Sequence, residues 1–508
     1  MVVKCNSLGL FGIDSFEVEV EADVSKGIPA FDIVGLPDAS VKESKDRVRS
    51  AIKNCGFDFP TVRVIINLAP ADIKKEGPVY DLPILVALLS ATGAINADLR
   101  ECAFVGELSL SGEVRKINGV LPMAIKASQS GIKKLFVPYE NALEGAVVRD
   151  VEIYPVKTVF DLVNHFKGNQ KIEKAVYEID EKEYEYETLD FSQVKGQYEA
   201  KRALEIAAAG GHNVLLIGPP GSGKSMLAKR MGTILPKMTF DEMIETTKIH
   251  SVAGLMSSKA GLITQRPFRS PHHSVSAVGL AGGGAVPKPG EISLCHNGVL
   301  FLDELPEFSR VALETLRQPV EDSTVTISRA MGRLTYPCSF TLIAAMNPCP
   351  CGFYNHPVRQ CTCTDDAVHR YLSKISGPLL DRIDIHVEVP PVQYDDLTAK
   401  AQEESSAEIR KRVNKARKIQ TERYKGTKIT CNANLDSSMF ESVCVVDEKA
   451  GKLLKSAFER LGLTARAYDR ILKVARTIAD LDDSDIIKSH HITEAIQYRS
   501  LDRKYWGR

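Results

Sequence analysis

A glycine-rich stretch near the middle of the chain constrains its fold most strongly. It begins with a continuous apolar run, residues 214–217, as expected of a strand buried on both faces. The loop that follows turns backbone N–H groups toward phosphate oxygens, with a lysine for the β and γ phosphates and a hydroxyl for Mg²⁺. The stretch therefore predicts a strand, an ATP-binding loop and a helix. The loop residues are Gly218, Pro219, Pro220, Gly221, Ser222, Gly223, Lys224 and Ser225.

Two more apolar runs end in polar residues suited to ATP hydrolysis. Residues 299–302 lead into Asp303 and Glu304, and residues 340–346 lead into Asn347. We expect Asp303 to hold Mg²⁺, Glu304 to polarise the attacking water and Asn347 to orient that water. An acidic pair or an asparagine after a single strand usually only caps the end of that strand. Three strands that each end in matching chemistry favour one catalytic site.

Phosphoryl transfer also needs positive charge near the transition state, often an arginine from a neighbouring subunit. Arg382 in SGPLLDRIDIH is the first candidate, with a salt bridge to Asp381 or Asp384 as the alternative reading. Arg466, at the start of an expected helix, is the second candidate and would face the nucleotide. Its alternative is a solvated arginine.

The charge balance of the 508 residues excludes one class of function, and patterns along the chain divide it into regions. The 65 basic and 65 acidic residues cancel, which excludes wholesale electrostatic coating of nucleic acid. We expect a mixed α+β domain at residues 1–168, a lysine- and glutamate-rich linker or solvated hairpin at 169–190, a largely parallel α/β core at 191–391 and a helical region at 392–508. In the first domain, apolar and acidic residues alternate along 16–24, as in a half-exposed strand, and Asp38 is expected to cap a helix over residues 38–54.

The sequence predicts a cytoplasmic protein without a membrane segment. The N-terminus lacks the pattern of a secretory signal, and the most apolar segment, residues 82–89, is too short to span a bilayer. Most of the eleven cysteines are scattered, which is typical of reduced thiols.

Four cysteines are clustered, in the segment NPCPCGFYNHPVRQCTC. Two Cys-x-Cys pairs could hold a structural Zn²⁺ in a tetrahedral site, with His356 as a spare ligand, or remain four thiols without a metal. The pair His272 and His273 is a weaker metal candidate, because adjacent side chains in a strand point apart. The cluster consists of Cys349, Cys351, Cys361 and Cys363.

These motifs together resemble an AAA+ ATPase of the Mg-chelatase-like branch, and specifically the ComM/YifB family. The segments RPFRSPHHSVSAVGLAGGG, PGEISLCHNGVLFLDELPEF and SGPLLDRIDIHVEVP carry the resemblance over nearly the whole chain. It implies a ring, generally a hexamer, with Arg382 completing a neighbour's site and Arg466 as the second sensor. It also implies that residues 194–197 lie beside the adenine.

Related ComM proteins act on DNA by branch migration during natural transformation, so the resemblance implies a DNA motor. The alternatives are the motor subunit of a metal-inserting enzyme and a regulatory ATPase that binds a protein. In the motor reading, Arg329 and Arg333 flank the tip of a hairpin and grip DNA in the ring pore, and Lys288 lies on a second pore loop. An ordinary surface hairpin is the alternative.

The N-terminal region resembles the proteolytic domain of Lon in GELSLSGEVRKINGVLPMAIKA and KKEGPVYDLPI. The positions of the Lon serine and lysine hold Val79 and Leu121, which supply neither a nucleophile nor a base. We therefore expect the fold without peptidase activity. Lys74, Lys75 and Lys116 read as solvated lysines or as contacts to a nucleic acid or partner.

Overall fold

The computed structural model describes residues 2–178, 189–284, 287–329, 332–356, 358–392, 403–461 and 464–507. The chain forms two compact units, each described separately below. The N-terminal unit comprises residues 1–181 and 240–263, and the C-terminal unit comprises residues 182–239 and 264–508. The grouping of residues 240–263 with the N-terminal unit was not predicted from sequence. The expected domain boundaries stay predictions.

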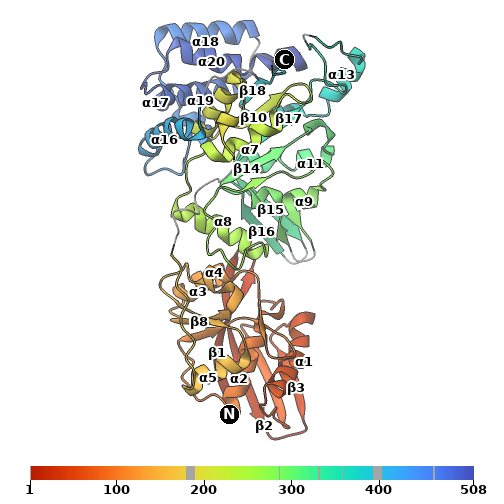
Figure 1. Ribbon diagram of the computed structural model, residues 1–508, viewed down its shortest axis with the longest axis vertical. Helices are drawn as coiled ribbons and strands as arrows, with labels where there is room; N and C mark the ends of the chain where they lie inside the picture. Colours follow the sequence, from red (N-terminus) through yellow and green to blue (C-terminus); the bar gives the residue numbers. More distant parts are fainter. Residues whose placement is uncertain are drawn as a thin grey trace. The chain divides into compact units, whose positions relative to one another are not determined.

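A seven-stranded mixed sheet organises the N-terminal unit, in the order β3-β4-β2-β1-β5-β8-β9. Figure 1 labels four of its strands, β1, β2, β3 and β8. The predicted alternation in residues 16–24 is confirmed, because Val18, Val20 and Ala22 are buried while the glutamates between them are not. The strands are β1 (Val2–Phe11), β2 (Asp14–Ser25), β3 (Ala30–Val34), β4 (Arg63–Ala69), β5 (Cys102–Phe104), β8 (Lys134–Pro138) and β9 (Glu152–Val156), with a small ribbon of β6 (Glu107–Leu108) and β7 (Val114–Arg115).

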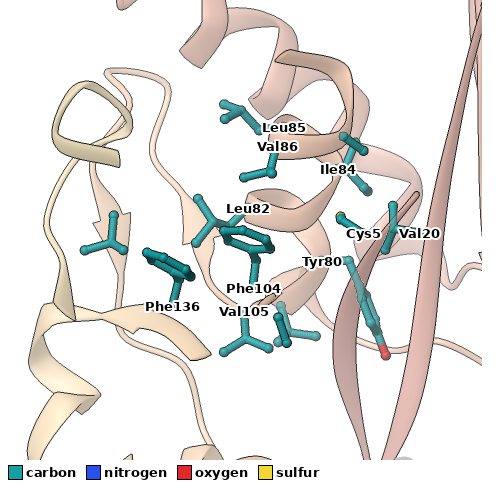
Figure 2. Close-up of a cluster of buried hydrophobic side chains, with 14 of the residues drawn as sticks. Cys5, Val20, Tyr80, Leu82, Ile84, Leu85, Val86, Phe104, Val105 and Phe136 are labelled. Atoms are coloured by element: carbon teal, nitrogen blue, oxygen red, sulfur yellow. The ribbon is translucent and has the colours of Figure 1, made fainter. Parts of the chain in front are cut away.

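Helices cover this sheet and complete its apolar core. Asp38 caps α1 by accepting the Val41 N–H at 2.7 Å, as the sequence predicted. Helix α2 is buried along most of its length, and its Leu82 lies beside Phe104, whose ring stacks on that of Phe136 (Figure 2). The helices are α1 (Ala39–Asn54), α2 (Asp81–Ala91), α3 (Val120–Gln129), α4 (Ala142–Gly145), α5 (Val159–Lys167) and α8 (Phe240–Val252).

Helix α8 is integrated into the N-terminal unit by hydrogen bonds. The Ser251 carbonyl accepts the Gly119 N–H at 3.1 Å, and the Ser251 hydroxyl donates to the buried Glu144. Along the chain, five residues separate α8 from the end of the helix that follows the predicted ATP-binding loop. Residues 240–263, which follow that helix, are therefore part of the N-terminal unit.

A parallel five-stranded sheet organises the C-terminal unit, in the order β11-β14-β17-β10-β18. Its strands are β11 (Phe268–Arg269), β14 (Gly298–Leu302), β17 (Phe340–Met346), β10 (Val214–Ile217) and β18 (Ile385–Glu388). The three apolar runs predicted as strands are thus β10, β14 and β17. Strand β17 lies between the other two, so the carboxyl ends of all three meet at one edge.

Helices surround this sheet (Figure 1). The helices after β18 form the predicted C-terminal helical region. One apolar cluster runs from the sheet into these last helices, so the helical region shares its core with the sheet. The helices are α6 (Tyr198–Gly210), α7 (Lys224–Ile234), α9 (Ala277–Ala281), α10 (Glu291–Leu294), α11 (Arg310–Glu314), α12 (Arg317–Asp322), α13 (Asp365–Leu372), α14 (Gly377–Leu380), α16 (Ser406–Arg423), α17 (Phe440–Val443), α18 (Glu448–Leu461), α19 (Ala465–Leu481), α20 (Ser489–Gln497) and α21 (Ser500–Trp506).

Two hairpins lie outside the main sheet. Strands β15 (Thr324–Arg329) and β16 (Gly332–Pro337) pair antiparallel, which confirms the predicted hairpin, and β12 (Gly282–Gly283) pairs with β13 (Lys288–Pro289). The predicted fold class is confirmed: a multidomain α/β protein with a mixed N-terminal sheet, a parallel sheet and a C-terminal helical region. Over the residues described above, no helix is both long and apolar enough to cross a membrane.

Candidate nucleotide site

The loop between β10 and α7 needs glycine for two separate reasons. A Cβ on Gly218 would lie 2.2 Å from the Val389 carbonyl oxygen, so a side chain there would clash with backbone. Gly221 and Gly223 have φ angles of 77° and 93°, in the left-handed region that glycine adopts without strain. Helix α7 begins directly afterwards at Lys224, and its unpaired N–H groups and dipole make this end attractive to phosphate.

Lys224 lies over the loop and reaches the end of β17. Its Nζ donates to the Gly218 and Pro219 carbonyls at 2.7 and 2.9 Å and lies 3.3 Å from Asn347 Oδ1. Burial lowers the pKa of Lys224 to about 8, against the attraction of Asp303, which acts to raise it. An anionic phosphate beside this amine would favour its charged form.

Ser225 and Asp303 provide oxygen ligands side by side. The Ser225 hydroxyl donates to Asp303 Oδ2 at 2.6 Å, which joins the first turn of α7 to the end of β14. A hydroxyl and a carboxylate are hard oxygen donors of the kind that Mg²⁺ prefers. A nucleotide-bound Mg²⁺ usually has only one or two protein ligands, and phosphate oxygens and water fill its other positions. The donor set therefore fits a nucleotide-bound Mg²⁺.

Glu304 follows Asp303 in a left-handed conformation, with φ of 53°, and its side chain is 56% exposed. Its Oε2 lies 3.3 Å from Nδ1 of His273. The expectation that His272 and His273 point apart was wrong, because neither lies in a strand and their rings are 4.0 Å apart. Instead, His272 Nδ1 contacts the Ser274 hydroxyl at 2.8 Å.

Arg382 and Arg466 line one cavity of about 550 Å³. Arg382 donates to the Pro378 carbonyl at 2.7 Å and pairs with Glu321, rather than with Asp381 or Asp384 as the alternative reading expected. Arg466 is 67% exposed and lies 3.9 Å from Asp381. The structure thus places the two predicted arginines together on one surface of the unit.

Asp384 makes a different set of contacts, two residues after Arg382. Its carboxylate contacts Arg470 at 2.8 Å, His212 at 3.3 Å and the Asn213 N–H at 3.1 Å. Burial acts to raise the pKa of Asp384, but Arg470 and His212 hold it well below its usual range. This charged network joins the amino ends of β10 and β18 to α19.

The segment expected beside the adenine contacts the ATP-binding loop. Gln197 Nε2 donates to the Ser222 carbonyl at 3.2 Å and to the Pro390 carbonyl at 2.7 Å. Val194 is buried, and its carbonyl accepts a hydrogen bond from Lys201 at 2.6 Å. Residues 194–197 are therefore anchored next to the phosphate loop.

The candidate DNA residues are only partly described. Arg333 is exposed on β16, and Lys288 is exposed on β13. The backbone of Arg329 pairs with Gly332, whereas its side chain and residues 330–331 at the hairpin tip lie outside the described residues. The proposed grip on DNA stays a prediction.

The four clustered cysteines are brought together, with all Sγ atoms within 4.8 Å of one another. His356 is not part of this group; its Nδ1 accepts the backbone N–H groups of Val358 and Arg359 at 3.1 and 2.9 Å.

In the N-terminal unit, Val79 and Leu121 are both buried and apolar. The reading of Lys75 as a solvated or ligand-contacting lysine was wrong, because its side chain is buried and donates to the carbonyls of Pro70 and Ile73. Lys116 donates to the Met256 carbonyl, and Lys74 is exposed beside Glu76.

Comparison with known proteins agrees with this geometry. Residues 190–397 match the family described as magnesium chelatase, subunit ChlI; residues 20–141 match subunit ChlI of Mg-chelatase, and residues 403–499 match its C-terminal region. Competence protein ComM of Haemophilus influenzae is 45% identical over 499 residues, covering 97% of this chain and 96% of ComM. The uncharacterized protein YifB of Escherichia coli is 44% identical over 497 residues, with 97% and 96% coverage.

A partial similarity concerns a protease. Lon protease 2 of Bacillus subtilis is 27% identical over 195 residues, covering 34% of this chain and 35% of that protein. The parallel sheet and the glycine-rich loop before α7 are those of a P-loop ATPase fold. The full-length similarities show that the chain belongs to the ComM/YifB family of Mg-chelatase-like AAA+ ATPases.

Replacing Lys224 with alanine tests the phosphate loop. Loss of one charge-assisted hydrogen bond should weaken ATP binding by about 10- to 100-fold. Lys229, exposed on the same helix, provides the matched control, and Lys229→Ala should bind ATP like the wild type. Titration with a fluorescent ATP analogue measures both. Equal affinities of the two variants would contradict the assigned role of Lys224.

Proposed function

We propose that the protein is an ATP-hydrolysing ring motor that acts on DNA. One observation carries the ATPase part: contacts join Lys224 to Asn347 and Ser225 to Asp303 at one edge of the parallel sheet. The similarity to a relative named competence protein, and the family resemblance to DNA branch-migration motors, support DNA as the substrate. The ring is homo-oligomeric, and the family resemblance favours a hexamer.

In this proposal each site residue has a separate task in hydrolysis. Lys224 and the loop N–H groups bind the β and γ phosphates, and Ser225 with Asp303 hold Mg²⁺, which neutralises phosphate charge when bound. Glu304 polarises the attacking water and Asn347 orients it. His273 holds the Glu304 carboxylate through the 3.3 Å contact, and release of that contact frees Glu304 for the water.

The shared cavity of Arg382 and Arg466 supports action on a neighbouring subunit. Arg382 pairs with Glu321 and Arg466 lies beside Asp381, so neither arginine is committed to its own phosphate loop by the contacts described here. The phosphates of a neighbour's ATP bound against this surface would lie beside both guanidinium groups. The site is then complete only between subunits, which couples hydrolysis to ring assembly.

The exposed cations support contact with the DNA backbone. Arg333 lies near the tip of the β15–β16 hairpin and Lys288 lies on the β12–β13 hairpin. Because phosphate contacts are sequence-independent, a motor that moves along DNA needs such cations and not base readout. We propose that Arg329, Arg333 and Lys288 face DNA in the ring pore.

Replacing His273 with alanine tests the restraint on Glu304. His273 and Glu304 are both partly exposed, so their ion pair contributes at most about 1 kcal/mol. Basal ATP turnover should therefore rise by up to about fivefold in His273→Ala. Glu304→Gln should abolish turnover while retaining bound ATP. His272→Ala is the matched control and should leave turnover unchanged. An unaltered rate in His273→Ala, or a rapid rate in Glu304→Gln, would refute these roles.

Mixing inactive variants tests the arginines between subunits. Lys224→Ala and Arg382→Ala rings should each be inactive, but mixed rings contain interfaces with an intact loop facing an intact arginine. Random assembly of equal amounts makes about a quarter of the interfaces active. Steady-state ATPase assays measure the recovery. No recovery in confirmed mixed rings would place Arg382 outside the neighbour's site.

The same assay separates Arg382 from Arg466. If both arginines come from one subunit and serve the same neighbour, Arg382→Ala and Arg466→Ala rings should not rescue each other, whereas Arg466→Ala and Lys224→Ala rings should. Rescue in the first mixture would mean that Arg466 acts on the nucleotide of its own subunit.

DNA dependence tests the substrate. ATP turnover should be stimulated by single-stranded, duplex or branched DNA, and the Arg329→Ala, Arg333→Ala double variant should lose this stimulation. Its binding should also depend less on salt, by about one phosphate contact per arginine. A Lys452→Ala, Lys455→Ala control on α18 should behave as the wild type. Retained DNA affinity and stimulation would contradict the hairpin role.

Stimulation by a protein or tetrapyrrole partner instead of DNA would favour the alternative functions.

A further inference from the structure

The four clustered cysteines have the spacing of metal ligands and not of disulfides. The Sγ atoms of Cys349, Cys351 and Cys361 are separated by 3.3, 3.5 and 3.7 Å, whereas a disulfide joins sulfurs at about 2.05 Å. Zn²⁺ binds thiolates at about 2.3 Å, which makes the edge of a ZnS₄ tetrahedron about 3.8 Å. Small adjustments would therefore place a zinc ion among all four sulfurs.

The backbone of this segment is shaped to bring the sulfurs together. Gly352 has a φ angle of 84° and donates to the Cys349 carbonyl at 3.0 Å, so the chain turns sharply directly after Cys351. The Cys363 N–H points to the Cys361 sulfur at 3.4 Å. Cys349 is fully buried, and the other three are partly buried. Four thiols within 4.8 Å of one another match the usual ligand set of a structural zinc site.

The cluster is connected to the nucleotide site in two places. Cys349 follows Asn347 by two residues, and Asn347 Oδ1 lies 3.3 Å from Lys224 Nζ. The turn at Gly352 also packs on the phosphate loop, since a Cβ at Gly352 would lie 2.4 Å from Cδ of Pro220. The cysteine loop therefore supports both the end of β17 and the outer side of the phosphate loop.

We propose that Cys349, Cys351, Cys361 and Cys363 bind one Zn²⁺ and that the metal-closed loop fixes Asn347 and Pro220 around the nucleotide. Closing a loop with a metal removes conformations in which its ends separate, so the turn keeps its packing on Pro220. The metal site stands on the cysteine geometry alone. Its effect on ATP rests on the proposed function of the nucleotide site.

Metal analysis of the full-length protein tests the site itself. Protein purified without added zinc or chelator should contain about one zinc per chain. The Cys351→Ser, Cys361→Ser double variant should contain none, whereas Cys55→Ser, outside the cluster, should retain it. Exchange with Co²⁺ should give the visible absorption of a tetrahedral thiolate site. Metal-free wild-type protein that also fails to bind Co²⁺, or full zinc in the double variant, would overturn the proposal.

Pro220→Ala tests the support of the phosphate loop separately from metal binding. It leaves all four thiols and the Gly352 turn in place but removes the ring against which that turn packs. We expect this variant to keep its zinc and to bind ATP about tenfold more weakly. The Cys351→Ser, Cys361→Ser double variant should lose both its zinc and its wild-type ATP affinity. Wild-type ATP affinity in both variants would refute the support. A wild-type protein that holds zinc but binds no ATP would instead contradict the proposed ATPase function.

Discussion

The parallel pairing of β10, β17 and β14 is the constraint on which the candidate site depends. Residues far apart in sequence, Lys224 at one strand, Asn347 at the next and Asp303 at the third, meet because parallel strands end at the same edge. The contacts across that edge, 3.3 Å between Lys224 and Asn347 and 2.6 Å between Ser225 and Asp303, follow from this register. Glycine at position 218 permits the close approach of the loop to β18, since any side chain would strike the Val389 carbonyl.

The opposite edge of the sheet connects the arginines to the helical region. Asp384 contacts Arg470 of α19 and His212 before β10, and His212 Nε2 also contacts Thr477 at 2.7 Å. Arg382 lies two residues before Asp384, and its carbonyl accepts from Asn213 at 3.2 Å. A buried charge network is costly to break, because removing one partner leaves the others unpaired. The arginine surface and α19 are therefore held in a defined arrangement within this unit.

Local patterns predicted much of this structure, and tertiary contacts account for what they missed. The three apolar strands, the capped helix after Asp38 and the β15–β16 hairpin depend on short-range signals, and all are present. The cysteines also come together as their spacing suggested. No short-range pattern indicates that His273 meets Glu304 or that Glu321 meets Arg382, since each pair depends on how distant segments pack. The burial of Lys75 and the placement of α8 in the N-terminal unit were missed for the same reason.

Phosphate release by the wild-type protein, with Mg²⁺ present and after its removal with a chelator, tests the central claim most directly. If Lys224, Ser225 and Asp303 converge on one Mg–ATP, hydrolysis should occur with Mg²⁺ and stop when the ion is withdrawn. Purified, assembled protein that releases no phosphate under any condition, or at a rate indifferent to the divalent ion, would contradict it.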